Sequence, residues 1–340
     1  MDTTAPRVQL NILPVGQGDC LHLRFHSLDG WHNVIVDSGP AGTSKAFRLL
    51  LEQIKDHGEA VDLLCFSHID DDHIKGAEKE FTSAKFDPTL IRQIWMNIPA
   101  GAIPEKNETG SFAPKSVETA TKLLKAIVNH DSPFTSVVTV GMELTIGDAR
   151  LEVVLPTQEL LDTYYEKWEM EAKIFREKSV KKDTSETNGS SIALLCTIGA
   201  HRLLLVGDTF ADKLICVGNR YAGTHGFSVV KLPHHGSDSN TTTEMLEALK
   251  TQELIISTHQ TVYRPGKDAM EAISAYGAIS GGVTVYGNYG WSRFADGVPN
   301  VTIIHPQYKA VMTKDGIEVY SDGSSEQLFA ETARGSYPAV

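Results

Sequence analysis

Three apolar runs in this sequence each end in aspartate or histidine residues. They are VDLLCFSHIDDDH (61–73), RLLLVGD (202–208) and FSVVKLPHH (227–235). Short apolar runs of this kind are typical of buried parallel strands. Because ligand sites in α/β folds lie beyond the carboxyl ends of such strands, we expect the three polar ends to converge at one place.

Strand-like and helix-like segments alternate along the chain, which predicts an α/β fold. Residues 44–58 carry apolar side chains at helical spacing, with Ser44 as the expected N-cap and Gly58 as the residue that ends the helix. The turn pair Gly147-Asp148 between two strand-like runs predicts a hairpin.

A segment at about 157–187 has an aromatic helical face followed by a polar run. We interpret it as a helical insertion that could act as a lid. We expect residues 1–321 to form one domain and residues 322–340 to form a C-terminal tail.

The charge balance weighs against non-specific coating of nucleic acid. Lys and Arg number 31 and Asp and Glu number 43, which gives a net charge of −12. A carboxylate-rich metal site would add acidic residues whose charge is neutralised by the cations bound there. The negative net charge therefore does not exclude a nuclease. Four cysteines without a C-x-x-C pair, no secretory leader and no long apolar run predict a cytoplasmic protein that is not membrane-bound.

The converging strand ends offer nitrogen and oxygen ligands for one or two divalent ions, Zn²⁺ or Mn²⁺. The candidate ligands are His68, Asp70, Asp72, His73, Asp208 and one of His234 and His235. Two ions near each other can activate a water as the nucleophile. The sequence has no G-x-S-x-G elbow that would indicate a serine nucleophile instead.

SHIDDDH is similar to the H-x-H-x-D-H signature of the metallo-β-lactamase fold, with Asp70 in place of the second histidine. The series VGQGDCLHLRF, VIVDSG, SHIDDDHIKG, NGSSIALL, LLLVGD and VVKLPHHGSDSNT resembles the hydrolase domain of ComEC-type DNA-uptake proteins and their free-standing relatives. The resemblance covers about residues 8–286, and the ordered series is more specific than any single motif.

This resemblance implies a four-layer αββα sandwich and a metal-dependent hydrolase, often of phosphodiesters. It implies that the first-motif ligands are His68, Asp70, Asp72 and His73, with Asp208 as the bridging carboxylate and His234-His235 as the last ligand pair. It also implies that Asp37 orients a ligand or a water from outside the coordination shell.

The sequence departs from the family pattern in three places. Asp70 makes the first metal position harder, which favours Mn²⁺ or Fe²⁺ over Zn²⁺. The usual mid-sequence histidine ligand has no clear counterpart. Where relatives have His-Pro, this chain has Arg264-Pro265, with His259 slightly earlier. We expect Arg264 to bind a phosphate and His259 to protonate a leaving group. The predicted catalytic residues are therefore Arg264, His259 and Asp72, of which Asp72 is also a predicted metal ligand.

Three hypotheses follow. The favoured one is a nuclease or other phosphodiesterase that uses a metal-activated water. The second is a hydrolase of a small phosphoester, lactone or thioester. The third is a degenerate metal-binding module that has a regulatory role or works together with a partner protein in a defence system.

We interpret GQGD (16–19) as a glycine turn, and the loop GNYGWSRF (287–294) as a surface that could stack on a base.

Overall fold

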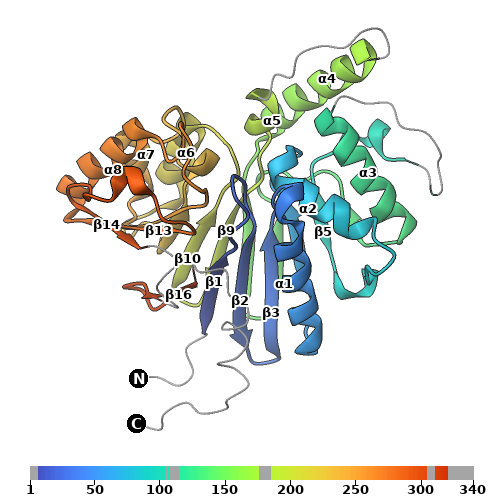
Figure 1. Cartoon of the computed structure of the whole chain (residues 1–340), viewed down its shortest axis with the longest axis horizontal. Helices are drawn as coiled ribbons and strands as arrows, with labels where there is room; N and C mark the ends of the chain where they lie inside the picture. Colours follow the sequence, from blue (N-terminus) through green and yellow to red (C-terminus); the bar gives the residue numbers. More distant parts are fainter. Residues whose placement is uncertain (1–6, 105, 107–114, 176–184, 305–310, 321–340) are drawn as a thin grey trace.

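The computed structural model describes residues 7–104, 106, 115–175, 185–304 and 311–320. Two eight-stranded sheets face each other, and helices cover the outer face of each sheet (Figure 1). This arrangement confirms the predicted αββα sandwich.

The first sheet contains the strands β15 (Val311–Met312), β16 (Glu318–Tyr320), β1 (Val8–Ile12), β2 (Leu21–Ser27), β3 (Gly30–Val36), β4 (Leu63–Phe66), β5 (Ile94–Met96) and β6 (Phe134–Thr135), in this spatial order. The second contains β14 (Val301–Ile304), β13 (Val283–Gly287), β12 (Glu253–Ile256), β11 (Val229–Lys231), β10 (His201–Leu205), β9 (Ala193–Ile198), β8 (Ala149–Leu155) and β7 (Glu143–Ile146).

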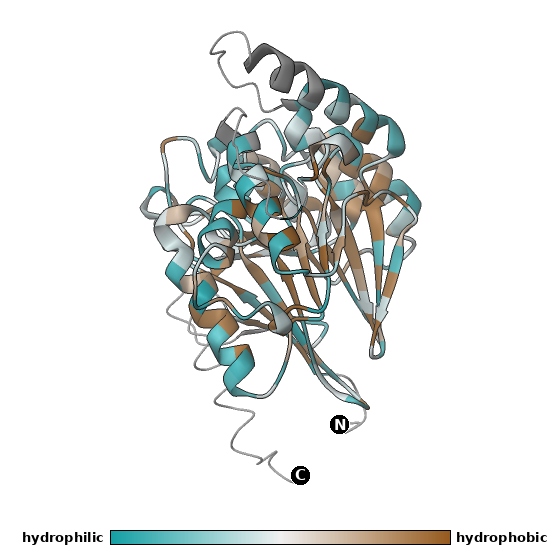
Figure 2. Cartoon of the chain, turned by 90° about the vertical axis from the view of Figure 1, so that its right-hand side faces the viewer, coloured by the Kyte–Doolittle hydropathy of each residue, from teal (hydrophilic) through white to brown (hydrophobic). Residues whose placement is uncertain are grey.

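Helices lie on both sides of this pair of sheets. The first side carries α1 (Ser44–Asp56), α2 (Asp71–Phe81), α3 (Lys115–Asn129) and α4 (Gln158–Phe175), and the second side carries α6 (Ala211–Tyr221), α7 (Thr243–Leu249) and α8 (Lys267–Ser280). The short α5 (Ser185–Gly189) lies next to α4. Brown, apolar residues follow the strands between the helices (Figure 2).

Three apolar cores hold the layers together. The core between the sheets includes Leu23 and Leu151, and the two outer cores join each sheet to its helices. Because both faces of each sheet are covered, β4 (LLCF) is apolar throughout, whereas β1 (VQLNI) and β2 (LHLRFHS) alternate apolar residues with polar ones.

The local predictions are confirmed except at the start of α1. The hairpin turns at Gly147, with Ile146 opposite Ala149, and Gly58 follows α1 with φ +70°. The N-cap of α1 is Thr43 rather than Ser44, because the short 3₁₀ turn Ala41–Thr43 brings the chain into the helix one residue earlier.

The predicted insertion forms α4 and α5 within the described residues. Leu161, Tyr164 and Trp168 of α4 are buried in the first outer core, so this part of the helix packs on the sandwich. Residues 176–184 and the expected tail 322–340 lie outside the described residues. No helix in the described part of the chain is long and apolar enough to cross a membrane.

Parallel strands at the centre of each sheet bring the site together. β3, β4 and β5 run parallel in the first sheet, as do β10, β11 and β12 in the second. The ends of β4 and β10 meet at one edge, where a Cβ on Gly207 would lie 2.6 Å from Oγ of Ser67. Only glycine lets the two sheet edges approach this closely.

Candidate metal centre

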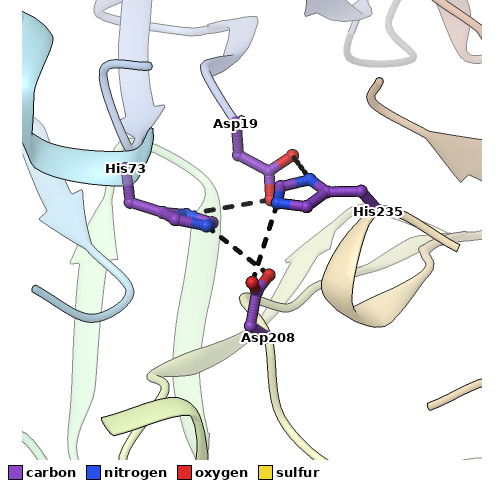
Figure 3. A group of neighbouring side chains, drawn as sticks. All are labelled: Asp19, His73, Asp208 and His235. Carbon is purple, nitrogen blue, oxygen red and sulfur yellow. Dashed lines mark ion pairs between the residues drawn. The ribbon is translucent and has the colours of Figure 1, made fainter. Parts of the chain in front are cut away.

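Asp208, which follows β10, lies among histidines from two other strand ends (Figure 3). Its Oδ1 is 3.5 Å from Nε2 of His73, and its Oδ2 is 3.6 Å from Nε2 of His235. Oδ2 is also 4.0 Å from Nε2 of His68 and 3.5 Å from Nε2 of His234. The three polar clusters of the sequence therefore meet around one carboxylate.

The three buried histidines all turn Nε2 toward this centre because other groups face Nδ1. Asp37 lies 2.7 Å from Nδ1 of His73, Ser67 Oγ lies 3.0 Å from Nδ1 of His68, and the carbonyl of Ser257 lies 3.0 Å from Nδ1 of His235. Each Nε2 is buried and has no hydrogen-bond partner among the described residues. Such atoms are costly unless a cation binds them.

The spacing of these atoms fits a divalent metal ion. Two ligands on a tetrahedral zinc, at about 2.1 Å each, lie about 3.4 Å apart. Ligand atoms of Asp19, His73, Asp208 and His235 lie within 4.8 Å of one another. The residues present thus fit a divalent metal ion.

Two groups of candidate ligands lie around Asp208. One group contains His73, His235 and Asp72, whose Oδ2 is 3.6 Å from Nε2 of His235. The other contains His68 and Asp70, whose Oδ2 is 3.9 Å from Nε2 of His68. The second group has more oxygen character, which suits a harder ion.

The start of α2 separates the three adjacent aspartates. Asp70 occupies the N-cap position but its side chain makes no capping bond, and Asp72 turns toward His235. Asp71 turns away, and its carboxylate accepts hydrogen bonds from Lys75 and Thr119. Asp71 is therefore an ordinary helix-terminus aspartate, whereas its two neighbours belong to the centre.

The turn after β11 aims both of its histidines at the centre. His234, His235 and Gly236 have φ values of +49°, +56° and +72°. Left-handed conformations cost non-glycine residues about 1–3 kcal/mol each and cluster at functional sites. His235 is fully buried, whereas His234 is 22% exposed and also contacts Arg264. These features favour His235 as the ligand of the pair.

Asp37 occupies a strained position behind the centre. It follows β3 with φ +62°, and its two oxygens accept hydrogen bonds from the amide and the hydroxyl of Ser67, at 2.7 Å each. Its Oδ2 also faces His73. The carboxylate is placed to orient this imidazole and to fix its tautomer.

Asp19 also lies at the centre, although the sequence interpretation treated its segment only as a glycine turn. It is buried, 3.3 Å from Nδ1 of His235, and it pairs with the buried Lys231. The acid directly before the run CLHLRF and the lone base within FSVVKLP were the signal that could have indicated this pair.

Arg264 and His259 have different surroundings. A guanidinium nitrogen of Arg264 contacts Nε2 of His234, which places it next to Asp208. His259 is exposed, and its ring lies edge-on to Tyr289 with the centroids 6.1 Å apart. The structure thus brings Arg264 into the group but leaves His259 outside it.

The loop at 287–294 has a structural role. Asn288 donates to the carbonyl of Leu13, Tyr289 OH accepts from the amide of Gly16, and the indole of the buried Trp291 donates to the carbonyl of Thr258. The bonds to Leu13 and Gly16 hold the segment that carries Asp19 against the second sheet. The tyrosine and tryptophan are therefore used in packing and not as an open stacking surface.

Burial lowers the pKa values of the histidines at the centre, whereas the neighbouring carboxylates raise them. Burial lowers the pKa of His68 to about 3, with a further contribution from His73. Burial also opposes the charge on His235, but Asp208 and Asp19 outweigh it and raise its pKa to about 9. The pKa of His73 is raised for the same reason by Asp208 and Asp37. Without a metal, two of the imidazoles would carry protons in its place.

A family model described as the metallo-beta-lactamase superfamily matches residues 14–259. Similar solved structures include the metallo-beta-lactamase fold protein YhfI from Bacillus subtilis (11% identity, TM-score 0.40, covering 88% of this chain and 96% of that one). Another is the diiron β-hydroxylase CmlA from Streptomyces venezuelae, with 12% identity and a TM-score of 0.44, covering 88% of this chain and 53% of that one. A third is Zn²⁺-bound PqqB from Methylobacterium extorquens, with 11% identity and a TM-score of 0.40, covering 84% of this chain and 85% of that one. A comparison with curated proteins finds no match.

Proposed function

Because the chain belongs to the metallo-β-lactamase superfamily, we propose that it is a metal-dependent hydrolase of phosphodiester bonds that acts on nucleic acid. The observation that carries this proposal is the set of three buried, unpartnered Nε2 atoms around Asp208. Neither a structural core nor a simple helix cap accounts for such a group.

The chain would hold one or two divalent ions, Zn²⁺ or Mn²⁺, with His68, Asp70, Asp72, His73, Asp208 and His235. Bound at these ligands, such ions would supply Lewis acidity toward a phosphate and would lower the pKa of a water. Asp37, fixed by the Ser67 hydroxyl, faces Nδ1 of His73, so that Nε2 is the nitrogen available to an ion.

Arg264 is the residue that favours a phosphate substrate. Its side chain lies beside His234 and forms no ion pair with a carboxylate within the described ranges. A guanidinium at the border of an acidic centre can hold two phosphate oxygens while the reacting bond lies near the ligands. An uncharged lactone or thioester would not need this cation.

The residues beside Arg264 favour nucleic acid. Val262 and Tyr263 are 76% and 80% exposed, and Arg293 holds their loop by donating to the carbonyls of Thr261 and Val262. An exposed tyrosine in a loop held in this way, next to a phosphate-binding arginine, can stack on a base.

The test compares Asp72→Ala with Asp71→Ala. We expect the parent and Asp71→Ala to cleave single- or double-stranded DNA or RNA with Mn²⁺ or Zn²⁺, and Asp72→Ala to lose at least a hundredfold in rate. Equal rates for all three proteins would refute the proposed centre. Hydrolysis of bis-p-nitrophenyl phosphate without cleavage of any nucleic acid would instead indicate a small phosphoester substrate, which the net charge of −12 would suit.

A further inference from the structure

Lys231 is a buried cation at the end of β11, next to the candidate metal centre. Its side chain is 0% exposed, and its ammonium contacts Oδ2 of Asp19, a residue 212 positions away whose side chain is 1% exposed. Taking two charges out of water carries a large desolvation penalty before their attraction is counted. A pair of this kind at a functional site therefore needs an explanation beyond stability.

Asp19 faces the back of two ligand imidazoles. Its Oδ1 lies 3.3 Å from Nδ1 of His235, and its Oδ2 lies 4.0 Å from Nδ1 of His73. In both rings the opposite nitrogen, Nε2, faces Asp208. Asp19 is therefore close to the metal ligands, but on the side away from the bare nitrogen atoms (Figure 3).

The arrangement repeats the one around His73. There Ser67 donates to Asp37, and Asp37 faces Nδ1 of the imidazole. Here Lys231 donates to Asp19, and Asp19 faces Nδ1 of His235. The difference is that the second support carries a full positive charge, which keeps Asp19 ionised and occupies one of its oxygens.

We propose that Asp19 and Lys231 are a positioning pair that holds His235 in its metal-binding tautomer, and that Asp19 is not itself a metal ligand. Lys231 fixes the carboxylate, which lies 3.3 Å from Nδ1 of His235 and shares its N–H with the carbonyl of Ser257, 3.0 Å from the same nitrogen. The inference rests on the metal centre of the proposed function, but it concerns residues that no part of that proposal uses.

The test measures metal stoichiometry, metal affinity and the visible spectrum of bound Co²⁺ in Asp19→Asn, Lys231→Met and the double variant. We expect Asp19→Asn to keep the full stoichiometry and the Co²⁺ band pattern, with an affinity about 10- to 100-fold lower, the usual cost of losing an outer partner of a ligand. The double variant should bind metal better than Lys231→Met alone, because no unpaired carboxylate is left buried.

The following results would overturn the inference. Loss of one metal equivalent in Asp19→Asn, or a changed Co²⁺ coordination spectrum, would make Asp19 a ligand. Additive losses in the double variant would mean that the two residues do not act as a pair. Arg24→Met, which breaks the buried Arg24–Glu59 ion pair away from the centre, is the control and should lower stability without changing metal affinity. An equal loss of affinity in the control would make the effect merely structural.

The two proposals fail in different ways. If the parent protein binds no metal ion, the proposed function falls before any variant is compared. If the parent binds metal but Asp19→Asn binds it with unchanged affinity and spectrum, only the positioning role is lost. Should Lys231→Met not fold, the single Asp19→Asn comparison still decides between a ligand and a positioning residue.

Discussion

The carboxylate of Asp37 lies 2.7 Å from Nδ1 of His73, and Nε2 of the same imidazole lies 3.5 Å from Asp208. One ring thus connects the end of β3 in the first sheet to the end of β10 in the second. Asp37 is fixed in turn by two hydrogen bonds from Ser67. The orientation of the ligand is therefore set by groups behind it, before any metal binds.

We expect Asp37→Asn to lower metal affinity about 10- to 100-fold, because an amide can present its NH₂ group to Nδ1 and favour the wrong tautomer. Competition with a chromophoric chelator measures the affinity. Asp71→Asn is the matched control, since Asp71 pairs with Lys75 and Thr119 and not with the centre. Equal affinities for the two variants would contradict the support that we assign to Asp37.

Arg264→Lys should raise KM for a phosphodiester about tenfold or more while leaving metal affinity unchanged. Lysine keeps the charge but cannot present the planar fork that holds two phosphate oxygens. Steady-state kinetics together with a metal titration separate the two effects. Arg150→Lys, on the exposed hairpin, should leave both quantities at the parent values. A loss of metal in Arg264→Lys would show that the arginine supports the ligands instead.

Tyr263→Ala should weaken binding of single-stranded nucleic acid by about 1–3 kcal/mol if the exposed ring stacks on a base. Fluorescence anisotropy with a labelled oligonucleotide measures this loss. Leu28→Ala removes a side chain that is 99% exposed at the β2–β3 turn and should have no effect. Unchanged binding in Tyr263→Ala would remove the stacking argument and leave Arg264 as the remaining support for a phosphate substrate.

The convergence of ligands could be predicted from the sequence because it follows from topology. Residues directly after parallel apolar strands lie at one edge of their own sheet, which groups His68 with His73 and Asp208 with His235. That the two sheet edges meet was implied by the resemblance to the αββα sandwich. The choice between His234 and His235 could not be made, because it depends on two successive left-handed residues in the turn.

The roles of Asp19 and the 287–294 loop were harder to predict for a different reason. Both depend on contacts between segments more than 200 residues apart, such as Lys231 with Asp19 and Asn288 with Leu13. Local patterns show GQGD as a turn and GNYGWSRF as an exposed loop. Tertiary packing buries Trp291 and places Asp19 behind the ligands, and no periodicity contains that information.

Metal binding at pH 7 should release about two protons. In the metal-free protein the pKa of His235 is raised to about 9 and that of His73 is also raised, so both rings hold a proton that a metal must displace. His68 should release none, because its pKa is lowered to about 3. Affinity should therefore rise with pH, about tenfold per unit for each proton, and level off above the raised pKa values. Calorimetry in two buffers of different ionisation enthalpy counts the protons; a count of zero would contradict these charge states.

Gly76→Ala should destabilise the protein and weaken metal binding, although alanine favours a helix by about 1 kcal/mol over glycine. A Cβ at Gly76 in α2 would lie 2.1 Å from the carbonyl oxygen of Ser38, and backbone atoms cannot move aside as a flexible side chain can. Because Ser38 also binds the carbonyl of His73, moving α2 outward would move this ligand.

We expect the loss to be about 1–3 kcal/mol in the free energy of unfolding, the usual cost of an overpacked contact. Urea denaturation of the metal-free protein measures it, and a chelator titration measures the accompanying loss of metal affinity. Gly42→Ala is the matched control, since a Cβ there meets no atom within 4 Å. If Gly76→Ala were as stable as Gly42→Ala and bound metal equally well, α2 would tolerate displacement and the placement of His73 would not depend on this close approach.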